Sequence, residues 1–349
     1  MSVPALAVPA LYCPFPAAVH PLHEELDRAA VAWLEKFSLT TDSRQLARLS
    51  RSSAGELAAR TSPRGAHPAL GVAADLIIWM CAFDDAHCDR PGTDPAELAA
   101  VAGRLQRVLD APWAAGDDDP FAAALCDLRL RVGELASPVQ LQRWTTATGL
   151  YLLSQTWAAS RRAREQPPSL ALADYGAVRL HSGGVIACTA LLDIVNGHPL
   201  PAAQAERPAV RALTEMCGTL VGWDNDLLSR HKELSRGEET AGLVDLVRRR
   251  RDCTPAEALT ESIALRDQVM RRFVDLSGRL LTDGDPALRA YVEDLRAWVR
   301  GNIDWSLHCD RYLNPDHPAA LPSGCTDEPP AVPDGPIGIP GLDWWWNVG

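Results

Sequence analysis

Apolar residues recur at helical spacing along most of this chain, and this periodicity constrains its fold more than any other feature. Three stripes consist of Leu22, Leu26, Ala29, Ala30, Trp33 and Phe37; of Leu98, Val101, Leu105, Val108 and Leu109; and of Leu141, Trp144, Leu150, Leu153 and Trp157. The third stripe predicts one long helix from Pro138 to about Arg164. Alternating β-branched runs, which would predict strands, are missing. The pattern therefore favours an all-α domain.

Composition narrows the class of protein further. The chain has 349 residues, of which 47% are hydrophobic, so it can bury a large core without disulfide or metal staples. Its 34 Lys and Arg residues are outnumbered by 45 Asp and Glu residues, and this acidic balance argues against nucleic acid as a partner. The nine cysteines are scattered without a Cys-x-x-Cys pair, which predicts reduced thiols and a cytoplasmic location.

The sequence divides into three parts. Residues 1–20 form a Pro-rich segment without signal-peptide features, residues 21–313 form the helical domain, and residues 314–349 form a Pro-rich tail. No uninterrupted apolar run is long enough to predict a membrane span. The tail lacks helical periodicity and predicts a structureless extension. Its adjacent tryptophans, residues 344–346, could instead dock on the domain, cover an opening or bind a partner.

An apolar run from Leu76 to Phe83 ends abruptly in three acidic residues, Asp84, Asp85 and Asp89. On a helix, Asp85 and Asp89 share one face and Asp84 lies about 100° away, so the carboxylates can meet at the mouth of a cavity. Such oxygen ligands suit Mg²⁺, which binds one or two carboxylates together with substrate phosphates. A polar helix end is the plainer interpretation, and this cluster alone does not decide between the two.

A second polar cluster follows another apolar run. Asn225, Ser229 and Glu233 are spaced four residues apart on one helical stripe, with Lys232 beside it. The amide oxygen, hydroxyl and carboxylate can chelate Mg²⁺, while the ammonium group can hold a phosphate. Two such clusters in one helical chain favour metal ions that are shared by a polyphosphate.

These clusters resemble the metal motifs of bacterial class I terpene cyclases. Asp84, Asp85 and Asp89 match the aspartate-rich motif in its DDxxxD form. The second motif, NDxxSxxKE, is matched at every signature position by Asn225, Asp226, Ser229, Lys232 and Glu233.

Further matches extend the resemblance over about residues 10 to 313. Arg179 stands at the position of the family's diphosphate-sensing arginine, and the helix break after it has Ser182 and Gly183 as linker and effector positions. Arg311 and Tyr312 match the pair near the end of the catalytic domain. Arg179 could also be a surface residue and Arg311 part of a helix end, but glycines in an apolar helix cost stability and indicate a functional break.

The resemblance implies a class I terpenoid synthase bundle, a single domain of about ten to twelve helices around a deep apolar pocket. It implies three Mg²⁺ ions between the motifs, with Asp84 as a ligand, and with Asp85 and Asp89 orienting Arg179 or pairing with it. A linear isoprenyl diphosphate would lose its diphosphate, and the allyl cation would cyclise before losing a proton or capturing water. The residues implied to act on the substrate are Arg179, Gly183, Lys232, Arg311 and Tyr312. A homodimer is left open.

The implied pocket would be walled by the same apolar segments. Tyr291, Trp298, Trp305 and Tyr312 recur every seven residues on one stripe, which suits core packing and also the stabilisation of carbocations by aromatic faces. The wall candidates are Trp79, Met80, Cys81, Phe83, Cys188, Trp223, Trp298 and Trp305. Relatives that cyclise farnesyl diphosphate often have bulky aromatics where this chain has Met80, Cys81 and Cys188. The smaller side chains favour geranylgeranyl diphosphate by a narrow margin.

Two other functions are compatible with parts of this pattern. A chain-elongating isoprenyl diphosphate synthase shares the fold but uses two aspartate-rich motifs, whereas the second motif here contains Asn, Ser and Glu. A helical scaffold without activity would bind neither Mg²⁺ nor diphosphate.

Overall fold

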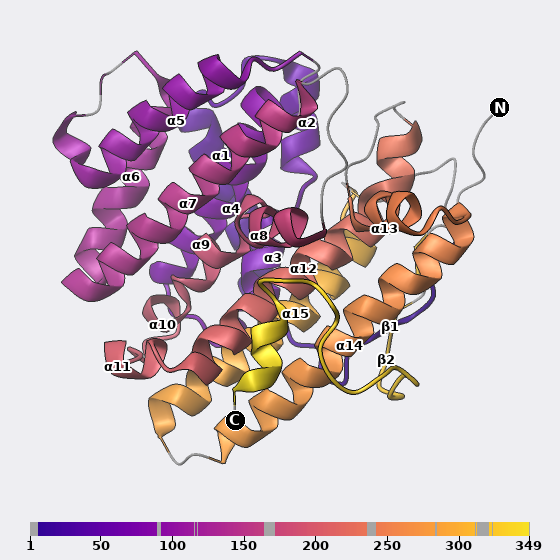
Figure 1. Cartoon of the computed structure of the whole chain (residues 1–349). Helices are drawn as coiled ribbons and strands as arrows, with labels where there is room; N and C mark the ends of the chain where they lie inside the picture. Colours follow the sequence, from indigo (N-terminus) through magenta and orange to yellow (C-terminus); the bar gives the residue numbers. More distant parts are fainter. Residues whose placement is uncertain are drawn as a thin grey trace.

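Helices form most of the computed structural model (Figure 1), which describes residues 6–88, 92–114, 116, 118–163, 172–235, 242–282, 285–310, 312, 321–322 and 324–348. The helices are α1 (His23–Lys36), α2 (Ser43–Ser50), α3 (Ala54–Thr61), α4 (Ala69–Phe83), α5 (Pro95–Asp110), α6 (Pro120–Leu135), α7 (Pro138–Arg162), α8 (Leu172–Ser182), α9 (Val185–Thr189), α10 (Leu192–Val195), α11 (Ala202–Ala205), α12 (Pro208–Ser235), α13 (Leu243–Arg251), α14 (Pro255–Leu281) and α15 (Pro286–His308). The all-α prediction is confirmed.

The two polar clusters lie toward the ends of two helices that pass through the core, α4 and α12. Apart from Asp75, which pairs with Arg131 of α6 at 2.7 Å, helix α4 is apolar, and it packs against α1, α3 and α6. Helix α12 packs against α8, α14 and α15, and its fully buried Trp223 directly precedes the polar cluster. Each helix therefore passes from an apolar interior into polar residues at one end.

The long helix α7 follows its predicted bounds but not its predicted face. It begins at a capping box formed by Ser137 and Gln140, which satisfies backbone groups at the helix start. The predicted apolar stripe is wrong at two positions, because Leu150 and Leu153 are 37% and 63% exposed. The buried face carries Tyr151 and the polar Gln155 instead.

The segments at the two ends of the domain contact each other. Strand β1 (Leu11–Tyr12) pairs in parallel with strand β2 (Cys325–Thr326), so the Pro-rich tail returns to the N-terminal segment. The carbonyl of Tyr12 accepts a hydrogen bond from Arg266, which is fully buried and forms an ion pair with Asp224 at 2.8 Å. This buried pair anchors the N-terminal segment to α12 and α14.

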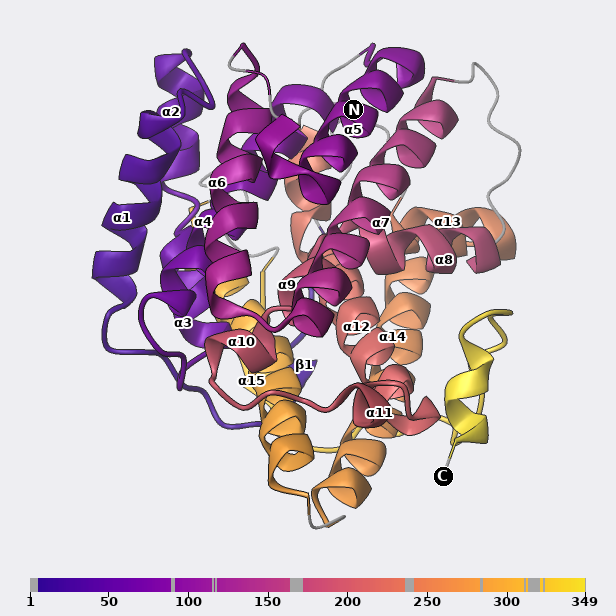
Figure 2. The same cartoon turned by 90° about the vertical axis from the view of Figure 1, so that its left-hand side faces the viewer.

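The described part of the tail is packed on the domain, which differs from the predicted structureless extension. Trp345, in the short helical turn η4 (Asp343–Asn347), is fully buried, and its indole N–H donates to Glu215 of α12 at 3.0 Å. Arg272 of α14 donates to the carbonyl of Trp345 at 2.7 Å. Leu342 lies over Gly176 of α8, where a Cβ would be 3.1 Å from its methyl group. The tail is therefore held by long-range contacts to α8, α12 and α14 (Figure 2, yellow).

Within the part of the chain that the structure describes, no single helix is long and apolar enough to cross a membrane. Taken together, α8 and the segment Val185–Val195 have the length and apolar composition of a membrane span, but the two are bent by 45° at the break between them.

Candidate active site

The first acidic cluster lies on a wide helical turn. After α4 ends at Phe83, residues Asp84–Cys88 continue as a π-helical turn, η1. Asp84 Oδ1 accepts hydrogen bonds from the Tyr151 hydroxyl at 2.7 Å and from Gln155 Nε2 at 3.2 Å. Burial and the charge of Asp84 raise the pKa of Tyr151 well above its usual value, so this phenol remains a donor at neutral pH.

Asp85 is held differently from the expectation. Its carboxylate forms a 2.6 Å ion pair with Arg48 of α2, instead of the implied contact with Arg179. The difference arises because α2 packs against α4 beside this turn, whereas Arg179 is engaged by α12. Asp89, the third member of the motif, lies outside the described residues.

The second cluster lies on α12, as predicted. Asn225 Oδ1 accepts a hydrogen bond from Arg179 Nη2 at 2.7 Å, and its Nδ2 donates to the hydroxyl of Tyr312. Ser229, one turn further along the helix, is buried. Lys232 and Glu233 belong to α12, but their side chains lie outside the described part of the structure.

Arg179 is the centre of this half of the site. Its Nη2 atom also lies 2.9 Å from the carbonyl oxygen of Gly222 and 2.9 Å from Asp226 Oδ1. Asp226 accepts two further hydrogen bonds, from the hydroxyl of Tyr175 and from the backbone N–H of Leu243 at 2.9 Å. Burial and the charge of Asp226 raise the pKa of Tyr175, which keeps this hydroxyl protonated.

The expected break after Arg179 is present. Helix α8 ends at Ser182 and α9 begins at Val185, with Gly184 in a left-handed conformation at φ 72°. A Cβ at Gly184 would be 2.6 Å from the sulfur of Met80, so both its backbone conformation and its close packing favour glycine. A Cβ at Gly183 would lie 3.3 Å from Arg179 Nη1.

The matched pair near the end of the domain is described only in part. Helix α15 ends at His308, so Tyr312 does not continue the helical stripe that its spacing predicted. Its ring instead packs edge-on against Trp305, and its carbonyl contacts His231 Nε2 at 2.9 Å. Arg311 lies outside the described residues.

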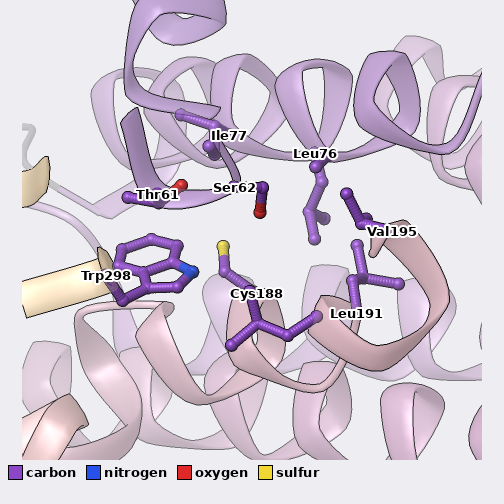
Figure 3. Close-up of a pocket in the computed structure, with 10 residues that line it drawn as sticks. Thr61, Ser62, Leu76, Ile77, Cys188, Leu191, Val195 and Trp298 are labelled. Carbon is purple, nitrogen blue, oxygen red and sulfur yellow. The ribbon is translucent and has the colours of Figure 1, made fainter. Parts of the chain in front are cut away.

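The wall candidates do not all face one space. Cys188 and Trp298 line an interior cavity of about 10 Å³, and Figure 3 shows the Cys188 thiol pointing into the space between Trp298 and Ser62. Trp79 stacks on Phe83 and donates to the carbonyl of Phe121 at 3.2 Å, on the side of α6. The indole of Trp305 donates to the carbonyls of residues 52 and 53, before α3.

The remaining wall candidates lie elsewhere around this interior. The sulfur of Met80 packs on the helix break at Gly184, Cys81 is partly buried, and Trp223 is fully buried in α12. Burial raises the pKa of the Cys188 thiol to about 12, so this wall residue is uncharged at neutral pH.

Sequence reasoning missed the residues that hold the motifs in place: Tyr151, Gln155, Tyr175 and Arg48. Tyr151 and Gln155 are four residues apart and share one helical face, which was the available signal. Their acceptors lie far away in the sequence, so the pattern on α7 alone could not identify them.

The donors near the two motifs suit a hard cation. Among the described residues no three His, Cys, Asp or Glu side chains gather at one point. The motifs instead offer a carboxylate from Asp84, an amide oxygen from Asn225 and a hydroxyl from Ser229, all of them oxygen donors that fit Mg²⁺. Asn225 Oδ1 accepts one hydrogen bond, from Arg179, and its second lone pair can bind a cation.

A family model described as "Terpene synthase family 2, C-terminal metal binding" matches residues 75–272, which include Asp84, Arg179 and the cluster on α12. The chain belongs to terpene synthase family 2. This terpene synthase is 39% identical to germacradien-6-ol synthase of Streptomyces pratensis, over 98% of this chain and 97% of that protein. It is 36% identical to a T-muurolol synthase of Streptomyces clavuligerus described as cyclising (2E,6E)-farnesyl diphosphate, over 97% of this chain and 81% of that protein.

A solved structure shares the fold over nearly the whole chain. The SVS_A2 protein, from an ancestral sequence reconstruction, has a TM-score of 0.83 and 31% identity, covering 97% of this chain and 98% of its own. The protein is therefore a class I terpene synthase, a metal-binding terpene cyclase whose relatives include sesquiterpene and diterpene synthases.

Proposed function

We propose that this terpene synthase uses Mg²⁺ to ionise a linear isoprenyl diphosphate and cyclises the resulting carbocation to a terpene hydrocarbon or alcohol. One observation carries the proposal. A series of hydrogen bonds runs from Asp84 through Gln155 to the end of α8, the helix that holds Arg179, and from Arg179 to Asn225. Both metal motifs and the arginine between them therefore belong to one connected site.

Different residues would bind the metal and the diphosphate during ionisation. Asp84, Asn225, Ser229 and Glu233 would hold the metal, and bound Mg²⁺ would stabilise the negative charge of the departing diphosphate as a Lewis acid. The guanidinium of Arg179 can bind two phosphate oxygens at once. Lys232, Arg311 and Tyr312 would add further donors. The carbon–oxygen bond breaks with its electron pair on the diphosphate, and the allyl cation remains among apolar side chains that exclude water.

Geranylgeranyl diphosphate is the first candidate substrate because three residues of the pocket wall have side chains smaller or more flexible than an aromatic ring. These residues are Met80, Cys81 and Cys188, and methionine packs easily around irregular ligands. The cavity beside Cys188 holds about 10 Å³, far below the roughly 300 Å³ of a ligand pocket, so its lining side chains must move to admit an isoprenyl chain. Farnesyl diphosphate is the second candidate, which the similarity to the T-muurolol synthase supports.

The test is incubation with the C10, C15 and C20 diphosphates and Mg²⁺, followed by mass spectrometry of the products. We expect the C20 diphosphate to be turned over fastest. Cys188→Trp should then shift the ratio of kcat/KM values toward the shorter chain by about tenfold, because overfilling a packed wall costs about 1 to 3 kcal/mol. Much faster turnover of farnesyl diphosphate by the unaltered enzyme would contradict the wide-pocket argument.

We also place the enzyme in the cytoplasm. The structure describes all nine cysteines and joins none of them in a disulfide, which supports a reducing compartment.

A further inference from the structure

Gln155 lies in the middle of α7 and is nearly inaccessible to solvent, with 6% of its surface exposed. Its side-chain amide donates to two acceptors in separate parts of the site. Nε2 lies 3.2 Å from Asp84 Oδ1 on η1 and 2.8 Å from the carbonyl oxygen of Ser182 at the end of α8. One amide nitrogen carries two protons, so both bonds can exist together.

Tyr151, one turn earlier on α7, provides a natural comparison. Its hydroxyl donates to the same oxygen of Asp84 at 2.7 Å, but it does not reach the carbonyl of Ser182. Tyr151 can therefore hold Asp84 without Gln155. Among the hydrogen bonds between residues that the structure describes, those of Gln155 connect Asp84 to α8.

The carbonyl of Ser182 occupies a sensitive place in the fold. Carbonyls in the last turn of a helix lack partners within the helix and need donors from outside. Gln155 is the donor to the Ser182 carbonyl. Ser182 lies directly before the break at residues 183–184 and about one turn after Arg179. If the side-chain amide of Gln155 moves, the last turn of α8, the helix that holds Arg179, loses or shifts its hydrogen-bond donor.

We propose that Gln155 is a positioning residue that couples the metal aspartate Asp84 to the helix break after Arg179. A cation that draws the Asp84 carboxylate changes the position of the Gln155 amide, and the Ser182 carbonyl follows because the same nitrogen holds both oxygens. Cation binding at Asp84 and diphosphate binding at Arg179 then favour each other, as linkage requires of coupled sites. The inference rests on the proposed function, because it assumes that Asp84 binds Mg²⁺.

Hydrogen exchange tests the coupling without any turnover. The backbone N–H of Gly184 donates to the carbonyl of His181 at 3.0 Å, so its exchange reports opening of the break. We expect Mg²⁺ alone to slow exchange at this amide by about fivefold or more in the unaltered protein. Gln155→Met keeps the length of the side chain but removes its amide, and we expect it to abolish this slowing.

Two matched variants complete the experiment. Tyr151→Phe removes the other donor to Asp84 and should weaken Mg²⁺ binding about tenfold, while saturating Mg²⁺ still slows exchange at Gly184. Gln142→Met makes the same chemical change on an exposed face of α7 and should behave like the unaltered protein. If Gln155→Met does not fold, Gln155→Ala replaces it, since alanine also lacks a donor for the Ser182 carbonyl and adds no charge beside Asp84.

Each outcome has a clear meaning. Normal Mg²⁺-induced slowing in the Gln155 variants would overturn the coupling and leave the proposed function intact. Loss of the response in Tyr151→Phe at saturating Mg²⁺ would also overturn it, because the response would then depend only on how Asp84 is held. If the unaltered protein shows no response to Mg²⁺ and turns over no isoprenyl diphosphate, the coupling and the proposed function both fail.

Discussion

The two halves of the site hold Asp84 and Asp226 in contrasting ways. Asp84, on the side of α4 and α7, accepts hydrogen bonds from a phenol and an amide, which are both neutral donors. Asp226, on the side of α8 and α12, is paired with the guanidinium of Arg179. Neutral donors fix a carboxylate without cancelling its charge, whereas an ion pair offsets it. The carboxylate of Asp84 therefore keeps its charge for a cation, whereas that of Asp226 is already offset by Arg179.

The largest effect should come from removing a metal ligand. Asp84→Asn should lower kcat on the order of a thousandfold, because the metal contributes several kcal/mol to charge stabilisation and each 1.4 kcal/mol is about tenfold in rate. Steady-state kinetics and thermal unfolding would measure this, and the unfolding midpoint should change little. Asn225→Ala and Glu233→Ala should cause comparable losses.

A neighbouring residue supplies the control for this prediction. Asp85→Asn makes the same substitution at a carboxylate paired with the partly exposed Arg48, so its loss of activity should be about tenfold or less. Equal losses in the Asp84 and Asp85 variants would show that the two residues share one role.

The next effect concerns stability on the side of α8 and α12. Trp345→Ala should lower the free energy of unfolding by about 3 kcal/mol, because the indole is fully buried and its hydrogen bond to Glu215 is lost. Urea denaturation would measure the change, with the partly buried Trp346→Ala as the milder control. Hydrogen exchange should increase in α8 and α12 but not in α4 or α7. An increase in all four helices would remove the contrast between the halves.

Arg179→Lys should act on the second half alone. A single nitrogen of the guanidinium, Nη2, contacts the oxygens of Gly222, Asn225 and Asp226. The planar group carries further N–H groups that can bind phosphate oxygens at the same time, which a point-like ammonium cannot do. We expect kcat/KM to fall about thirtyfold, which corresponds to about 2 kcal/mol for lost charge-assisted hydrogen bonds. Wild-type kinetics in this variant would show that Arg179 does not bind the diphosphate.

The smallest effect compares one phenol from each half at alkaline pH. Burial raises the pKa of both Tyr151 and Tyr175, so each keeps its proton in the folded state when the unfolded chain ionises near pH 10. The unfolded state binds fewer protons there, so stability is intact below pH 10 and falls as pH rises above it.

Each Tyr→Phe variant should therefore lose less stability between pH 9 and 11 than the unaltered protein. The difference should approach about 1.4 kcal/mol per pH unit above pH 10. Urea midpoints across this range would measure it. Similar slopes in the two variants are expected because burial dominates both shifts; clearly different slopes would indicate that the charge of Arg179 matters more than burial.

The sequence predicted the helical architecture and the placement of Asn225 and Ser229 on one helical face, because both depend on short-range spacing. Arg179 and Tyr312, which contact Asn225, were implied only by the family resemblance. Sequence reasoning failed for the buried face of α7, where Leu150 and Leu153 are exposed and Gln155 is buried. Hydrophobic periodicity assumes that a buried face is apolar, but this face meets the polar end of α4. The sequence left the tail open between a structureless extension and tryptophans docked on the domain, because the tail's contacts are to Glu215 and Arg272, more than seventy residues away. Such contacts leave no local pattern.

The packed tail bears on how this enzyme could be engineered. Arg272 donates hydrogen bonds to the carbonyls of both Trp345 and Val348, so the last described residue is still part of a structural contact. A segment inserted directly after Val348 would begin within that contact, and a bulky or charged insertion would pull η4 away from α12. Because Leu342 also rests on the helix that carries Arg179, such an insertion could alter catalysis without touching any residue of the active site.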